Sequence, residues 1–85
     1  MSRLSKTLEQ ILRGNSDPNI DFNDLRSLLS ALKFRERIRG SHHIFTRTGV
    51  TEIINLQPKG SKAKSYQVRQ VRQLITKYGL GEDDV

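Results

Sequence analysis

The chain has 85 residues, a formal net charge of +6 and no cysteine. This length fits one domain, and the lack of cysteine excludes disulfides and thiolate metal sites. The excess of positive charge favours a polyanionic partner, with solubility alone as the alternative. The first residues lead into no long apolar run, and no stretch approaches the roughly 18 apolar residues of a membrane span. We therefore expect a cytoplasmic protein with no signal peptide and no membrane partner.

Two amphipathic helices are predicted in the first third of the chain. The first covers residues 5–12 with Ser5 as its cap, and Gly14 ends it. Its apolar positions are Leu4, Leu8, Ile11 and Leu12. We interpret residues 1–19 as this accessory helix and a turn-rich linker. The second helix begins after the N-cap Asp21. Its apolar stripe consists of Phe22, Leu25, Leu28, Leu29 and Leu32.

A change to period-two alternation then predicts three strands. Arginines alternate with apolar or acidic residues before Gly40, and β-branched residues dominate after Gly49. The expected strands are residues 34–39, 42–47 and 51–56, separated by turns at Gly40-Ser41 and Thr48-Gly49, with a loop at 58–61.

A last helix is predicted over residues 65–78, ending at Gly79. The order is helix, helix, three strands, helix, which indicates an α+β fold. Two apolar helix stripes need one apolar sheet face, so we expect a three-stranded antiparallel sheet with both stripes on one side and the other side wet. Residues 20–80 would form this domain, and residues 81–85 an acidic tail.

The Gly40-Ser41 turn predicts the position of both histidines. Glycine first in a two-residue loop is typical of a type II′ hairpin turn. Arg39 then pairs with His42 and Ile38 with His43. This register puts His42 on the wet face, together with Arg35, Arg37 and Arg39, while a slip of one residue would exchange the two histidines.

Three interpretations of the histidine pair are open from the residues alone. They can be ordinary hairpin residues, which is the commoner case. A metal site is disfavoured because adjacent strand residues point to opposite faces and no cysteine is available. The third interpretation is RNA cleavage, because an imidazole can take a proton from a ribose 2′-hydroxyl while nearby arginines hold the phosphate.

A leucine-rich helix precedes Gly40-Ser41-His42-His43-Ile44-Phe45, and the last helix ends Val71-Arg72-Gln73-Leu74-Ile75 before Gly79-Leu80. With these elements, residues 21–80 resemble the HicA toxins, which are ribosome-independent mRNA interferases of HicA–HicB toxin–antitoxin systems. The resemblance implies a fold like that of a double-stranded-RNA-binding domain, α-β-β-β-α, here with an extra N-terminal helix. It also implies one catalytic histidine, His42 first and His43 as the fallback, with Gly40 and Ser41 shaping the turn.

The chain departs from this family at residues 58–64, where many members carry a histidine after a proline. Here the run is Pro58-Lys59-Gly60-Ser61-Lys62-Ala63-Lys64. Lysines can hold phosphate but cannot easily replace an acid–base imidazole, which leaves open the group that protonates the leaving oxygen. We expect RNA contacts at Arg35, Arg37, Arg39, Lys59 and Lys62, with no metal and no cofactor.

The resemblance also implies the partners. These are mRNA and an antitoxin of the HicB type, which we expect to cover the basic face with an acidic surface. The alternative is a non-catalytic RNA-binding module with the same fold and charge. A basic scaffold that engages only an acidic protein is a third possibility.

Overall fold

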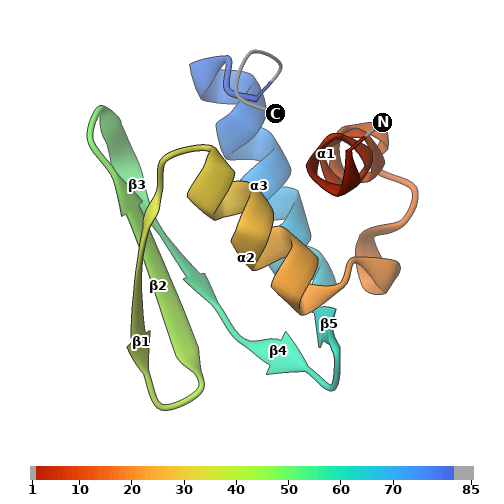
Figure 1. Cartoon of the computed structure of the whole chain (residues 1–85), viewed down its shortest axis with the longest axis horizontal. Helices are drawn as coiled ribbons and strands as arrows, with labels where there is room; N and C mark the ends of the chain where they lie inside the picture. Colours follow the sequence, from red (N-terminus) through yellow and green to blue (C-terminus); the bar gives the residue numbers. More distant parts are fainter. Residues whose placement is uncertain (1, 82–85) are drawn as a thin grey trace.

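The computed structural model describes residues 2–81 and shows an α+β protein. Strands β1 (Arg35–Arg39), β2 (His42–Arg47) and β3 (Val50–Leu56) form an antiparallel sheet in the order β1-β2-β3. Helices α2 (Phe22–Ala31) and α3 (Ser65–Tyr78) cover one side of this sheet, and α1 (Arg3–Arg13) packs on the far side of the two helices (Figure 1). Most of the predicted acidic tail, residues 82–85, lies outside the described residues.

The predicted stripe of α2 forms the centre of the core. Leu25, Leu28, Leu29 and Leu32 are fully buried, and Phe45 and Ile54 meet them from the sheet. Asp21 caps α2 as predicted, because its carboxylate accepts from the Asp24 amide at 2.9 Å. The sheet is therefore apolar toward the helices and open on its other side.

Helix α1 is longer than predicted and shares this core. It begins after Ser2, not Ser5, because the Ser2 hydroxyl accepts from the Ser5 amide. Ile11 is fully buried and Leu8 nearly so, whereas Leu12 is 41% exposed and does not belong to the apolar stripe. Gly14 ends the helix as predicted, with φ at 75°.

A partly buried ion pair holds the segment after α1 against α3. The Arg72 guanidinium donates to both carboxylate oxygens of Asp17, at 2.9 and 3.1 Å, and to the Ile11 carbonyl at 3.0 Å. The carboxylate of Asp17 raises the pKa of Arg72 further above its ordinary range. Arg72 is therefore bound within the fold, unlike a cation on a solvated helix face.

The hairpin register agrees with the prediction. Arg39 pairs with His42, Ile38 with His43 and Glu36 with Phe45. Gly40 has a φ of 57°, whereas Ser41 is not in the positive-φ region, which fits a type II′ turn. A Cβ at Gly40 would meet no neighbour within 4 Å, so the glycine is required by the backbone conformation and not by space.

The residues after β3 form a small hairpin and not the predicted loop. Strands β4 (Pro58–Lys59) and β5 (Lys62–Ala63) pair across Gly60-Ser61. The hairpin is tied to the segment before α2, since the Ala63 amide donates to the Ile20 carbonyl and the Phe22 amide to the Ser61 carbonyl, both at 2.9 Å. Strands of two residues are too short to be recognised by their own alternation of apolar and polar residues.

Candidate active site and nucleic-acid interface

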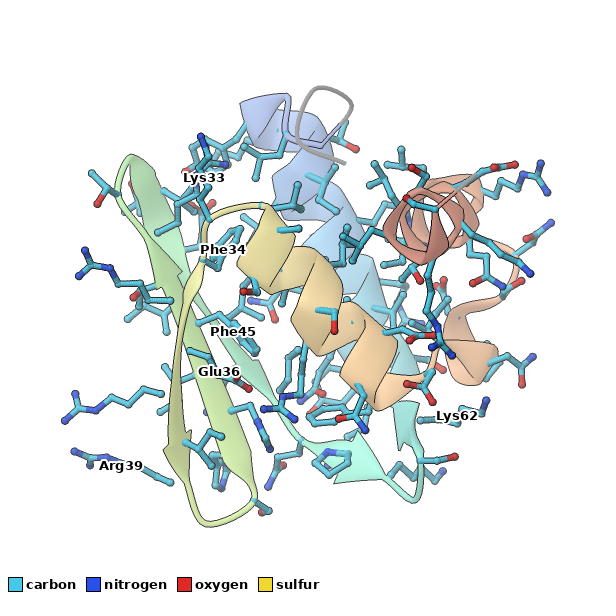
Figure 2. All side chains as sticks on the ribbon, in the orientation of Figure 1. Lys33, Phe34, Glu36, Arg39, Phe45 and Lys62 are labelled. Carbon is cyan, nitrogen blue, oxygen red and sulfur yellow. The ribbon has the colours of Figure 1, made fainter. Side chains whose placement is uncertain are left out.

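His42 is an exposed residue at the start of the central strand, on the face of the sheet that no helix covers. Its cross-strand neighbour is Arg39, which extends away from the helices, whereas Phe45 points toward them (Figure 2). The structure thus places His42 on the open basic face, as the register predicted.

A chain of side chains fixes the orientation of the His42 ring. Lys64 Nζ donates to Gln57 Oε1 at 3.2 Å, and an ammonium group can only donate. The amide nitrogen of Gln57, Nε2, therefore lies 3.3 Å from His42 Nε2, and this ring nitrogen accepts a hydrogen bond from the amide. The ring proton then belongs to Nδ1, which donates to Asn55 Oδ1 at 3.2 Å. This tautomer puts the basic lone pair on Nε2, where a ribose 2′-hydroxyl would have to replace the Gln57 amide before the ring could act as a general base.

Gln67 of α3 positions the strand end that carries Asn55 and Gln57. Its side chain is buried, with 3% of the residue exposed. It donates to the Asn55 carbonyl at 3.0 Å and accepts from the Gln57 amide at 3.0 Å. Because these contacts use backbone groups, the Asn55 and Gln57 side chains stay available to His42.

His43 occupies a different environment, between the sheet and α2. Its side chain is only 13% exposed. Its ring meets Phe22 edge-on at 4.9 Å between centroids, and its Nδ1 lies 2.7 Å from a carboxylate oxygen of Glu36. Glu36 in turn accepts twice from Arg26 of α2, at 2.7 and 3.1 Å. These contacts are those of a packing residue.

The Arg26–Glu36–His43 cluster gives the fold an acid-sensitive contact. The pKa of Glu36 lies below its ordinary value of 4.5, mainly because Arg26 donates to the carboxylate and secondarily because His43 does, while partial burial opposes them. A lowered folded-state pKa means that the unfolded chain binds more protons, so stability rises with pH through this range. The contribution of Glu36 is complete above about pH 4.5 and is lost as pH falls through the lowered value.

We therefore expect Glu36→Gln to reduce the free energy of unfolding by about 1 kcal/mol at pH 7, where the charged hydrogen bonds are intact. Urea unfolding of both proteins at pH 7 and pH 3 measures this, and the difference should shrink at pH 3. The matched control is Glu9→Gln, whose carboxylate forms an exposed pair with Arg13 within α1. If Glu36→Gln lowered the free energy of unfolding equally at pH 7 and pH 3, Glu36 would not be the source of an acid-sensitive contact.

The three strand arginines share the open face but lie at different distances from His42. Arg35, Arg37 and Arg39 are exposed, and none forms an ion pair within residues 2–81. Arg35 pairs with Thr46, which lies four residues, about 14 Å, along β2 from His42. Arg35 instead lines a small pocket with Lys33 and Arg47. Arg39 is thus the strand arginine beside the histidine.

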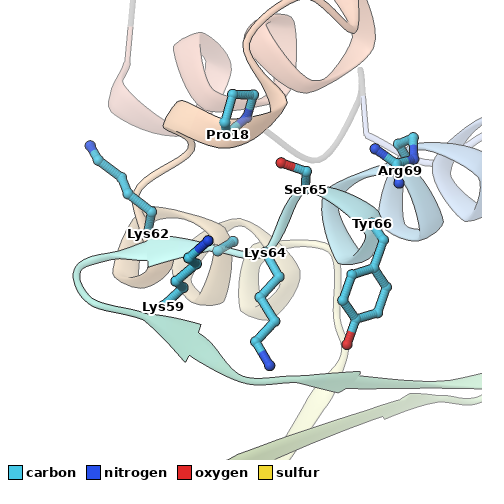
Figure 3. Close-up of a pocket in the computed structure, with 8 residues that line it drawn as sticks. Pro18, Lys59, Lys62, Lys64, Ser65, Tyr66 and Arg69 are labelled. Carbon is cyan, nitrogen blue, oxygen red and sulfur yellow. The ribbon is translucent and has the colours of Figure 1, made fainter.

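Lys59 and Lys62 lie on the β4–β5 hairpin, next to the start of α3. With Lys64, Tyr66 and Arg69 they line a pocket of about 750 Å³ (Figure 3). Lys64 joins this pocket to His42 through Gln57. The sequence prediction named Lys59 and Lys62 as RNA contacts and considered Lys64 only as part of the lysine-rich run 58–64. It did not include Asn55 and Gln57, which look like ordinary surface residues in the sequence.

Among residues 2–81, no three histidine, aspartate or glutamate side chains gather as metal ligands would, and no helix is long and apolar enough to cross a bilayer. Comparison with known proteins gives no match to any family model, curated protein or solved structure. The geometry of this site is therefore the basis for a functional proposal.

Proposed function

We propose that the chain is a metal-independent endoribonuclease that cleaves mRNA, acting as the toxin of a type II toxin–antitoxin system of the HicA kind. The observation that carries the proposal is the orientation of the exposed His42 ring, whose Nδ1 donates to Asn55 Oδ1 while its Nε2, the nitrogen that can accept a proton, is bound within residues 2–81 only by the side-chain amide of Gln57. An ordinary hairpin histidine needs no such chain of partners.

His42 acts as the general base in this proposal. A ribose 2′-hydroxyl replaces the Gln57 amide at Nε2 and gives its proton to this nitrogen, and the 2′-oxygen attacks the adjacent phosphorus. The new bond joins phosphorus to the 2′-oxygen, and the bond to the 5′-oxygen of the next nucleotide breaks. The imidazolium that has formed then returns its proton to this leaving oxygen. Asn55 stabilises the imidazolium by accepting from Nδ1 throughout.

The strand arginines stabilise the charge on the phosphate. Arg39 is opposite His42, and Arg37 lies two residues along the same exposed strand, on the same face. Guanidinium groups bind phosphate oxygens through two parallel hydrogen bonds, which also orients the phosphorus for attack. The order α2-β1-β2-β3-α3, with both helices on one side, supports a fold of the double-stranded-RNA-binding-domain type.

A HicB-type antitoxin belongs to the same proposal. An acidic surface laid on β1 and the start of β2 would pair with the exposed arginines and cover His42. Inhibition would then need no change in the toxin's conformation. We propose that both proteins act in the cytoplasm, where the mRNA substrate is.

The test is cleavage of a single-stranded mRNA fragment by the purified chain in excess EDTA. We expect the RNA to be cut at the same rate with EDTA and with added Mg²⁺, since histidine carries the chemistry. RNA that stays intact in both conditions, although the folded chain binds it in a salt-dependent way, would favour the non-catalytic RNA-binding module. Cleavage only with Mg²⁺ would contradict the metal-independent mechanism.

A further inference from the structure

The pocket between the β4–β5 hairpin and the start of α3 has features that the cleavage step does not use. Its volume of about 750 Å³ is within the usual range for small-ligand sites. Four of its lining residues are cations and none is acidic. These cations are Lys59, Lys62, Lys64 and Arg69.

Two of the lysines are placed at a cost to the fold. Lys59 and Lys62 are direct partners across the hairpin, and like charges in this position repel each other. Neither they nor Arg69 forms an ion pair within residues 2–81. An anionic ligand would relieve the repulsion, and a phosphate is the anion that several flexible cations bind well.

Tyr66 adds an aromatic surface to this cationic pocket. It is 56% exposed although it is a large ring, and its hydroxyl accepts from Gln67 Nε2 at 3.3 Å. Its side chain points in the same direction as that of Lys64 (Figure 3). An exposed ring next to phosphate-binding cations is the arrangement on which single-stranded RNA stacks a base.

The pocket is also connected to the catalytic residue. Lys64 lines the pocket and donates to Gln57, which contacts the His42 ring. A nucleotide in the pocket would therefore lie close, along the RNA strand, to the phosphate beside His42 at which cleavage occurs. Bases in a duplex are stacked on each other and cannot reach Tyr66.

We propose that this pocket binds one nucleotide of a single-stranded RNA substrate, with its base stacked on Tyr66 and its phosphate held by Lys59, Lys62 and Arg69. The assignment rests on the proposed function, because it takes the RNA that His42 would cleave as the ligand. It makes the enzyme selective for unpaired regions of mRNA.

The experiment measures binding of a fluorescent single-stranded RNA octamer to the His42→Ala protein, which should cleave it at least about 10²-fold more slowly than the wild type. Adding Tyr66→Ala should weaken binding between about fivefold and a hundredfold, the range for loss of one stacked base. Tyr66→Phe, which keeps the ring, should restore most of the affinity. Binding of an RNA duplex of equal length should be the same for all three proteins.

Lysine variants test the phosphate contacts separately. Lys62→Ala should reduce the slope of log affinity against log salt by about 0.7, as expected for one lost contact to a single strand. The control is Lys6→Ala on α1, an exposed lysine away from the pocket, which should leave the slope unchanged. Circular dichroism should show the same fold in every variant, because the substituted residues are exposed.

Two outcomes separate this inference from the proposed function. If the wild type cleaves RNA but Tyr66→Ala binds the octamer as tightly as its parent, the pocket assignment is wrong and the enzyme assignment stands. If the wild type never cleaves but binding depends on Tyr66, the pocket assignment stands and the enzyme assignment is wrong. Equal losses for single-stranded and duplex RNA would also overturn the pocket assignment.

Discussion

Replacing His42 by alanine is expected to lower RNA cleavage by about 10²–10⁴-fold, which is the usual contribution of a positioned acid–base group. The side chain is exposed, and no other imidazole lies on this face of the sheet within residues 2–81, because His43 is held under α2. The fold should be unaffected. Cleavage rates of the purified proteins measure the effect, and in cells induction of the wild type should arrest growth with loss of mRNA while the variant should not.

Two further variants make this result specific. His43→Ala should lower the melting temperature, since the ring packs on Phe22 and binds Glu36, but the folded protein should keep its cleavage rate. Asn55→Ala keeps the imidazole of His42 and removes the oxygen that accepts a hydrogen bond from its Nδ1. We expect a smaller loss of cleavage rate than in His42→Ala, with an altered pH–rate profile. If His43→Ala loses cleavage and His42→Ala does not, the roles of the two histidines are reversed.

The second large effect is expected at Ile11, inside α1. Ile11→Ala should reduce the free energy of unfolding by about 2–5 kcal/mol, because it opens a cavity in the shared core. In a domain of this size this would lower the melting temperature by roughly 10–25 °C. Alanine is a good helix former, so the loss would reflect packing and not helix propensity.

Leu12→Ala is the matched control for Ile11→Ala. Leu12 is the next residue in the same helix but is 41% exposed, so Leu12→Ala should change the free energy of unfolding by no more than about 0.5 kcal/mol. Hydrogen exchange of β2 shows whether the effect reaches the sheet, and we expect its protection to fall together with global stability. Unchanged protection of β2 in Ile11→Ala would mean that α1 unfolds alone, as an accessory helix would.

The sequence predicted the elements that have strong local signals. The Gly40-Ser41 turn determined the register of the first hairpin, and the register determined which histidine lies on the open face. The apolar stripe of α2 was predicted equally well, because helical spacing is a local feature of the sequence. The end of α3 was predicted for the same reason, since Gly79 adopts the left-handed conformation that commonly ends a helix.

The parts that the sequence did not reveal depend on contacts between distant residues. Asn55, Gln57 and Lys64 meet His42 only because Gln67, a polar residue on a helix, is buried against the end of β3. Nothing in the sequence distinguishes Gln67 from an exposed glutamine.

The turn of the β4–β5 hairpin did carry a sequence signal, because Gly60-Ser61 repeats the dipeptide of the Gly40-Ser41 turn and Gly60 also has a positive φ.

The position of β1 at the edge of the sheet has a consequence for how its arginines can be studied. An edge strand presents unpaired backbone groups to which another molecule can add a strand, and exposed charges on that strand oppose such self-association. Ile38, on the same strand, is 53% exposed, so the arginines are the main barrier to pairing between copies. Replacing them by alanine would remove both the proposed phosphate contact and this barrier. Replacing them by lysine keeps the charge that separates the copies and removes only the bidentate hydrogen bonds to phosphate, so lysine variants isolate the proposed role in RNA binding.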